Sequence, residues 1–163
     1  MIEVSNISSQ LIKHSTKSYK PRELSQITTA MIHHSATKNG RAASYARYHV
    51  NNLNWPAIGY HLVGDADGIH QTNEFDVVSW HTSGHNTNSI GICHTGNFDL
   101  REPTDNEYWS YIQMIIFAEI ELKKRLIIDY HHKHSYKSCP GLKFDEIKFL
   151  RVLNEFRILY HNY

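Results

Sequence analysis

The chain of 163 residues has few cysteines, no excess of either charge and no long apolar run. Two cysteines, Cys93 and Cys139, are too few for a disulfide framework, so we expect each to be a buried thiol or a metal ligand. The 17 Lys and Arg residues nearly balance the 16 Asp and Glu residues. This balance argues against a protein that binds nucleic acid by neutralising phosphates, and it gives no support for an anionic membrane surface. No run of about 18 apolar residues could span a bilayer.

Internal repeats, low-complexity tracts and linkers are also missing from the sequence. A chain of this length fits one compact domain with a sizeable core. The first residues, Met1 to Asn6, lack the basic region and the apolar run of a signal peptide. We therefore expect one domain, made without a secretory signal and acting as a monomer.

Segments with strand and helix patterns alternate along the chain. This alternation predicts an α/β fold, with a central mixed sheet flanked by helices. Residues 1–26 are polar and are expected to form an irregular or partly helical lead-in. The last helix is expected to pack through Ile147, Leu150, Leu153 and Phe156. The predicted strands cover residues 27–35, 58–64, 69–72, 88–95 and 126–130, and the predicted helices cover 41–53, 104–124 (opened by the capping box Thr104–Glu107) and 144–160.

The most informative stretch runs from Asp129 to Gly141. It holds three histidines, two lysines (Lys133 and Lys137) and Cys139. Imidazole nitrogen and thiolate sulfur are the ligands that Zn²⁺ prefers. Pro140-Gly141 predicts that Cys139 lies on a loop. A solvated loop is the alternative, because a chain with 13 histidines will cluster some of them. One loop cannot complete a metal site, so a further ligand must come from elsewhere.

The pair His33-His34, at the end of the first predicted strand, offers that ligand. Successive side chains of a strand point to opposite faces, so one of the two can face the site. The pattern alone does not decide which one. Paired carboxylates of a glycosidase are a weaker alternative, because Asp65 and Asp67 lie in a predicted turn.

Four segments in order resemble the zinc N-acetylmuramoyl-L-alanine amidases, the family of phage lysozyme-type amidases and animal peptidoglycan recognition proteins. They cover about residues 27 to 145, and each alone is weak. The segments are Ile32-His33-His34-Ser35-Ala36-Thr37, Gly59-Tyr60-His61, Asn88-Ser89-Ile90-Gly91-Ile92, and His131 with Cys139-Pro140-Gly141 eight residues later.

The resemblance implies a fold, a metal and a set of site residues. It predicts a zinc amidase domain over residues 27–163, of the type 2 amidase or peptidoglycan recognition protein kind. It implies Zn²⁺ ligands at His33, His131 and Cys139, with His34, His132 and His134 outside the ligand set. Tyr60 and Lys137 fall on catalytic positions, although a buried strand tyrosine and a solvated lysine are the alternatives. His81 resembles a histidine at the rim of the family's cleft and is expected to contact substrate.

The implied reaction is hydrolysis of the amide between N-acetylmuramic acid and the L-alanine of the stem peptide. The partners would be peptidoglycan or muropeptides. A single domain without a signal peptide suggests a phage or prophage endolysin, cytoplasmic until a helper protein releases it to the cell wall. An intracellular muropeptide-recycling amidase and a peptidoglycan-binding module without turnover are the alternatives.

Overall fold

A computed structural model describes residues 2–160 of the chain, so Met1 and the last three residues of the predicted 27–163 domain lie outside the described part. A six-stranded mixed sheet forms the middle layer, in the order β1-β5-β4-β7-β3-β8. Pairing is parallel throughout except between β4 and β5. The strands are β1 (Ser5–Asn6), β3 (Thr29–His34), β4 (Leu62–Asp65), β5 (Gly68–Gln71), β7 (Ser89–His94) and β8 (Ile127–Tyr130).

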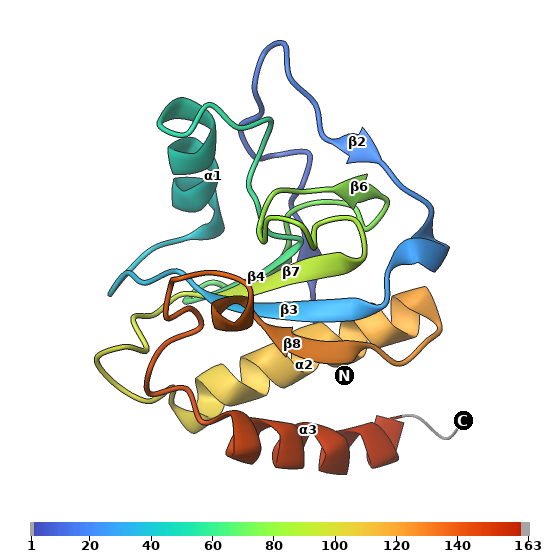
Figure 1. The fold of residues 1–163 in the computed structure, drawn as a ribbon, viewed down its shortest axis with the longest axis vertical. Coiled ribbons are helices and arrows are strands. Elements are labelled where there is room, and N and C mark those ends of the chain that lie inside the picture. Colours follow the sequence, from blue (N-terminus) through green and yellow to red (C-terminus); the bar gives the residue numbers. More distant parts are fainter. Residues whose placement is uncertain (1, 161–163) are drawn as a thin grey trace.

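Helices cover both faces of this sheet (Figure 1). Helix α2 (Asp105–Leu122) packs on one face, and α3 (Glu146–Tyr160) lies outside α2. Helix α1 (Ala42–Asn51) covers the other face, together with the segments that follow it. The predicted capping box starts α2, since Thr104 and Glu107 each accept a hydrogen bond from the other's backbone N–H. The predicted α/β fold with flanking helices is confirmed.

Two apolar cores separate the layers. The larger lies between the sheet and α2 with α3, and it includes the fully buried Ile32, Ile92 and Tyr111. The smaller lies between the sheet and α1, and it includes Val63 and Cys93. Cys93 is the buried free thiol that the sequence predicts.

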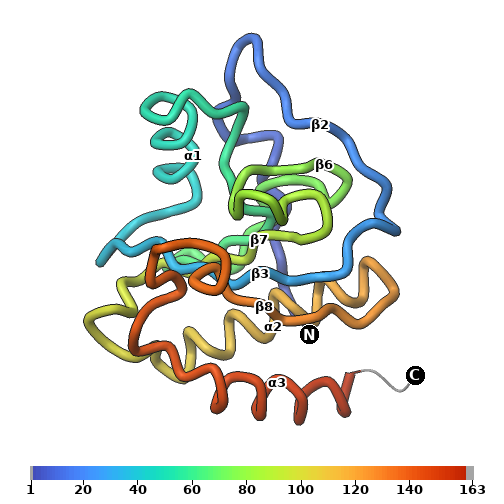
Figure 2. Tube along the Cα trace, viewed as in Figure 1, coloured from blue at the N-terminus to red at the C-terminus, as the bar shows by residue number. Residues whose placement is uncertain are grey.

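The lead-in segment joins the fold at two places (Figure 2). Its strand β1 pairs with β5 at the sheet edge, and β2 (Lys20–Pro21) pairs with β6 (Val77–Val78) in a separate ribbon. A short 3₁₀ helix, η1 (Leu24–Gln26), then leads into β3. Arg22 is buried, and its guanidinium donates to the carbonyls of Phe75, Asn86, Thr87 and Ser89. The lead-in is therefore tied to the residue pair before β6 and to the segment that enters β7.

The packing of α3 differs from the prediction at its first turn. Ile147 is 84% exposed, whereas Phe149 and Leu153 are fully buried. The helix begins at Glu146, and Arg157 lies on the same buried stripe as Phe149 and Leu153. The Arg157 guanidinium donates to the Glu119 carboxylate of α2. The buried stripe of α3 thus runs through Phe149, Leu153 and Arg157 and leaves Ile147 on the solvent side. No helix within residues 2–160 has the length and apolar character needed to cross a membrane.

Candidate metal centre

Two neighbouring parallel strands deliver the first two predicted ligands. Strand β3 pairs with β8 in the register Ile32 opposite Tyr130. Parallel strands end at the same edge of a sheet, so the residues that follow these two positions are neighbours. His33 is the next residue in β3, and His131 opens the 3₁₀ helix η2 (His131–Lys133) directly after β8.

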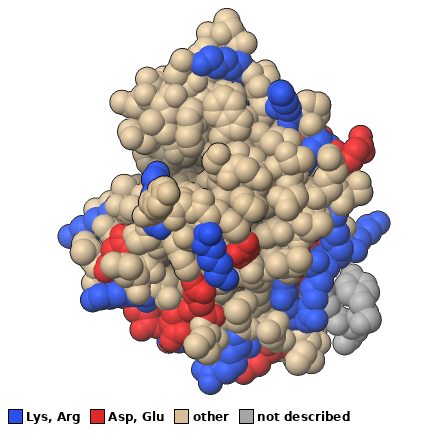
Figure 3. Space-filling view, viewed as in Figure 1, with Lys and Arg blue, Asp and Glu red and all other residues tan. Residues whose placement is uncertain are grey.

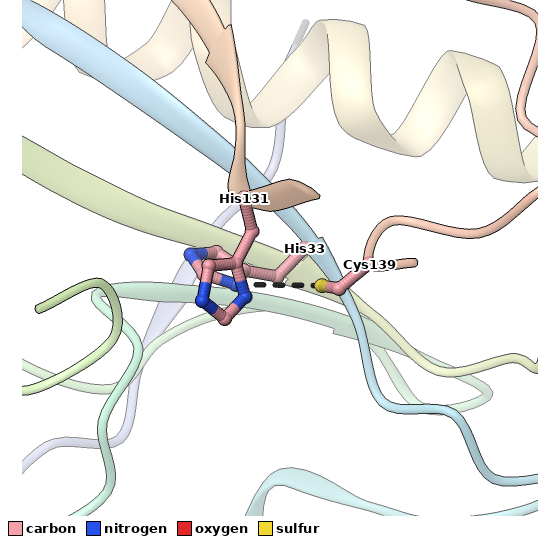
Figure 4. Close-up of side chains that lie close together, drawn as sticks. All are labelled: His33, His131 and Cys139. Atoms are coloured by element: carbon pink, nitrogen blue, oxygen red, sulfur yellow. Dashed lines mark hydrogen bonds between the residues drawn. The ribbon is translucent and has the colours of Figure 1, made fainter. Parts of the chain in front are cut away.

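Cys139 returns to the same place from the loop after η2 (Figure 4). The ligand atoms of His33, His131 and Cys139 all lie within 4.8 Å of one another. His33 Nδ1 is 3.6 Å from Cys139 Sγ, and the two imidazole centroids are 4.6 Å apart. His33 and Cys139 are buried and His131 is half-buried. Within residues 2–160, these three side chains form a cluster that could hold a metal ion.

Strand alternation decides between His33 and His34. The His33 ring faces the centre, while the His34 ring turns to the α2 side and accepts a hydrogen bond at Nδ1 from the Phe98 N–H, at 3.1 Å. The backbone N–H of His34 still donates to Cys139 Sγ, at 3.4 Å. His34 therefore positions the sulfur without offering its ring.

Burial sets the protonation of the three side chains. Desolvation holds the pKa of His33 well below its usual 6.5 and lowers that of His131 to about 4, and the Lys137 cation adds to both shifts. Both imidazoles are thus neutral at pH 7, as metal ligation requires. Desolvation raises the pKa of the Cys139 thiol to about 12, against the lowering effects of the His34 N–H and of Lys137. A buried thiol beside two neutral imidazoles suits a soft or borderline cation, which deprotonates the sulfur on binding. The residues present fit Zn²⁺.

The family model described as N-acetylmuramoyl-L-alanine amidase matches residues 23–142. The chain belongs to this family. Among its relatives, an endolysin of Klebsiella phage KP32 is 30% identical over 130 residues, which span 75% of this chain and 83% of that protein.

Solved structures show the same fold. N-acetylmuramoyl-L-alanine amidase LysC from Clostridium intestinale URNW aligns with a TM-score of 0.73 at 20% identity, covering 93% of this chain and 97% of that one. Peptidoglycan recognition protein-LE, solved with tracheal cytotoxin (a monomeric diaminopimelic acid-type peptidoglycan), aligns with a TM-score of 0.71 at 21% identity. That match covers 89% of this chain and 97% of the other. The resemblance inferred from the four sequence segments is confirmed.

The resemblance predicts catalytic roles for Tyr60 and Lys137, and the structure places both near the centre. Tyr60 is half-buried, and its ring centroid is 5.3 Å from that of His33. Burial, followed by the Cys93 and Cys139 thiols, raises the pKa of the Tyr60 hydroxyl well above its usual 10, so the hydroxyl keeps its proton. Lys137 is exposed on the ligand loop, near enough to all three ligand side chains to shift their pKa values.

His81 occupies a deeper position than the cleft rim. It is 8% exposed, and its Nδ1 lies 3.1 Å from His33 Nε2. Because His33 Nδ1 faces the sulfur, its Nε2–H is free to donate to His81 Nδ1, and His81 Nε2 then faces the Ser89 hydroxyl at 3.4 Å. This contact orients the His33 ring. Contact of His81 with substrate stays a prediction.

The other histidines of the ligand loop have acidic partners. His132 Nε2 lies 2.5 Å from Glu146, and His134 Nε2 lies 2.6 Å from Asp129. Both rings therefore point to carboxylates rather than into the centre, as expected of non-ligands. The two carboxylate oxygens of Asp65 also have partners, since they accept hydrogen bonds from the backbone N–H groups of Ala42 and Asp67.

Sequence reasoning missed two supports of the site. Tyr111 of α2 donates its hydroxyl to the His33 carbonyl at 2.5 Å, and Thr82 lies 3.3 Å from His33 Nε2. Tyr111 is 78 positions away from His33 in the sequence, and Thr82 is 49. No local spacing signals either contact.

Proposed function

We propose that this protein is a zinc-dependent N-acetylmuramoyl-L-alanine amidase that hydrolyses the amide between N-acetylmuramic acid and the L-alanine of the stem peptide. The convergence of His33, His131 and Cys139 carries the proposal, because it occurs in a chain of the amidase family at the positions that the resemblance implies. A set of three protein ligands is typical of catalytic rather than structural zinc. A zinc ion bound there supplies a Lewis acid and makes water nucleophilic at neutral pH.

Lys137 is proposed to stabilise the oxyanion that develops on the scissile carbonyl. It stands on the same loop as Cys139, two residues before it, and its cation acts on all three ligand side chains. One well-placed donor of this kind typically contributes about 3 kcal/mol to transition-state stabilisation. The same cation also suits a stem peptide that carries carboxylates.

Tyr60 is proposed to orient the attacking water and to relay its proton. Its hydroxyl stays protonated because of burial, and its ring packs beside His33. A phenol in this position can donate a hydrogen bond throughout the reaction and pass a proton to the leaving amine. His81 holds the outer nitrogen of His33 and so fixes the orientation of that ring.

The substrate is proposed to be peptidoglycan or its muropeptides, and the setting that of a phage or prophage endolysin. The relationship to the Klebsiella phage endolysin supports this setting. A binding module without turnover is the second candidate, since the fold is shared with a peptidoglycan recognition protein solved with a muropeptide. The presence of Cys139, Tyr60 and Lys137 in one place favours the enzyme. We also propose a monomer of 19.0 kDa, which light scattering after size-exclusion chromatography checks.

Mass spectrometry of digested peptidoglycan tests the function, with Cys139→Ser as the matched control. New free L-alanine amino termini that are absent from the control support the amidase. New reducing sugar ends would overturn the assigned reaction. Sedimentation of the protein with the wall without any product would make the binding module the better account.

A further inference from the structure

A continuous line of aromatic rings leads away from the metal centre along the α1 side of the sheet. It starts with the contact of 5.3 Å between the ring centroids of Tyr60 and His33. Within the line, neighbouring centroids are separated by 4.7 to 6.0 Å. We call this set the aromatic row, and its members in order from the metal centre are Tyr60, His49, Trp55, Trp80 and Tyr19.

Trp80 is the exposed member of the row. It is 42% exposed, and it is held edge-on between Trp55 at 6.0 Å and Tyr19 at 5.7 Å. Tyr19 is fixed in turn, because its hydroxyl lies 2.8 Å from the Ala57 carbonyl. Gly59 lets the two tryptophans close together, since a Cβ there would lie 2.5 Å from the Trp80 carbonyl oxygen and 2.8 Å from the Trp55 ring. The exposed indole is therefore rigid before any ligand arrives, which lowers the entropic cost of binding.

The row carries no charge at neutral pH. Its one titratable imidazole, His49, has a pKa lowered to about 4 by burial and is neutral at pH 7. The face drawn in Figure 3 is largely uncharged over α1 and β6, whereas its charged side chains gather over α2 and α3. The Lys137 cation stands on the ligand loop, away from the row in sequence and on a different element. The aromatic row is thus neutral, whereas the ligand loop carries a cation.

We propose that Trp80 is a stacking platform for a sugar ring of the glycan strand, next to the N-acetylmuramic acid whose amide is cut. This proposal rests on the proposed function. The substrate has a glycan and a peptide that diverge from the scissile amide, and the apolar C–H face of a pyranose packs well on an aromatic face with its negative quadrupole. The neutral row then takes the uncharged rings of the glycan, and the Lys137 side takes the carboxylates of the stem peptide.

Two soluble substrates with the same stem peptide test the platform. One carries N-acetylmuramic acid alone, and the other carries a tetrasaccharide of alternating N-acetylglucosamine and N-acetylmuramic acid. For Trp80→Ala, we expect kcat/KM on the tetrasaccharide to fall about tenfold through KM, the factor that 1.4 kcal/mol represents. We expect a change of less than about twofold on the single-sugar substrate, and partial recovery of the tetrasaccharide rate in Trp80→Phe. Tyr160→Ala is the matched control, because it removes a ring of the same 42% exposure from the end of α3.

The outcomes separate the platform from the reaction. Equal losses on both substrates, or no loss on either, would overturn the platform while leaving the amidase intact. If the wild-type protein cuts neither substrate at the amide, the proposed function fails instead. Isothermal titration calorimetry with the peptide-free tetrasaccharide then tests the platform without the reaction. Weaker binding by Trp80→Ala than by Tyr160→Ala supports the platform, and equal binding by the two variants overturns it.

Discussion

His49 makes the stability of the α1 side depend on pH. Its ring is 8% exposed and packs 4.7 Å from the Trp55 ring. Its Nδ1 accepts a hydrogen bond from the Gly59 N–H at 2.9 Å, which requires a lone pair on that nitrogen. Burial lowers the pKa of His49 to about 4, whereas the unfolded chain should show about 6.5.

The size of the effect follows from these two pKa values. Above about pH 6.5, His49 is neutral in both states and its contribution to stability is fully present. As the pH falls below about 6.5, the unfolded chain takes up a proton that the folded protein refuses, so unfolding becomes more favourable. Between about pH 7 and about pH 5 the loss amounts to about 2 kcal/mol, and it stops growing once the folded ring protonates near pH 4.

Urea unfolding of the wild type and of His49→Gln measures this loss. Glutamine can accept the Gly59 hydrogen bond through its amide oxygen and does not titrate. A chelator in every sample keeps both proteins metal-free, so metal release does not contribute to the pH dependence of unfolding. The contributions of the other histidines cancel when the two proteins are compared. We expect the wild type to lose about 2 kcal/mol more than the variant between about pH 7 and about pH 5. Parallel losses in the two proteins would refute the lowered pKa of His49.

Further substitutions test the metal centre and its surroundings. Cys139→Ser should lose bound zinc and amide hydrolysis while its circular dichroism stays native-like, and full activity in this variant would refute the ligand assignment. Tyr60→Phe should keep its zinc content but lower kcat by about 100-fold or more, whereas wild-type rates would make Tyr60 a packing residue. Lys137→Gln should lower kcat by about 100-fold through loss of oxyanion stabilisation and also raise KM through loss of a partner for the stem-peptide carboxylates, and a change confined to KM would refute the catalytic role of the lysine. Gly59→Ala should lower the free energy of unfolding by about 1–3 kcal/mol through the clash with the Trp80 backbone carbonyl and the Trp55 ring, and unchanged denaturation would show that these two groups can move away at no cost.

Spacing in the sequence predicted most of the fold because its signals are local. The capping box at Thr104 and the stripe that begins at Tyr108 fix the start and the buried face of α2. The strand before His131 and the turn at Cys139 follow from β-forming residues and Pro140-Gly141. The start of β4 was less well predicted, since the strand begins at Leu62 rather than at Ile58. Ile58 and Gly59 are buried without belonging to the strand, and apolar composition alone does not distinguish a buried loop from a buried strand.

The choice between His33 and His34 illustrates what required the fold. Both residues lie at the end of β3, and their spacing to Cys139 differs by one position. Strand alternation puts the two rings on opposite faces of the sheet, but the face that carries the site is known only from the fold, in which Cys139 lies beside the His33 ring and Phe98 donates to the His34 ring. The resemblance to the amidases assigned His33 correctly to the cluster, and the geometry supplies the reason.

Buried polar contacts between distant segments account for features of the fold that the hydrophobic pattern did not predict. A hydrophobic pattern treats Arg157 and Glu119 as solvent-facing, yet the two are buried and paired. Arg157 lies on the buried stripe of α3 with Phe149 and Leu153, and Ile147 lies off it. Arg22 is a second buried polar residue of this kind, in the lead-in that was predicted to be irregular or partly helical. Burying a guanidinium is costly unless its donors are satisfied, so an arginine that meets four backbone carbonyls fixes the segments that provide them. Those segments include Ser89, whose hydroxyl lies next to His81, and His81 orients His33. The lead-in therefore supports the candidate metal centre through a chain of contacts from Arg22 by way of Ser89 and His81 to His33.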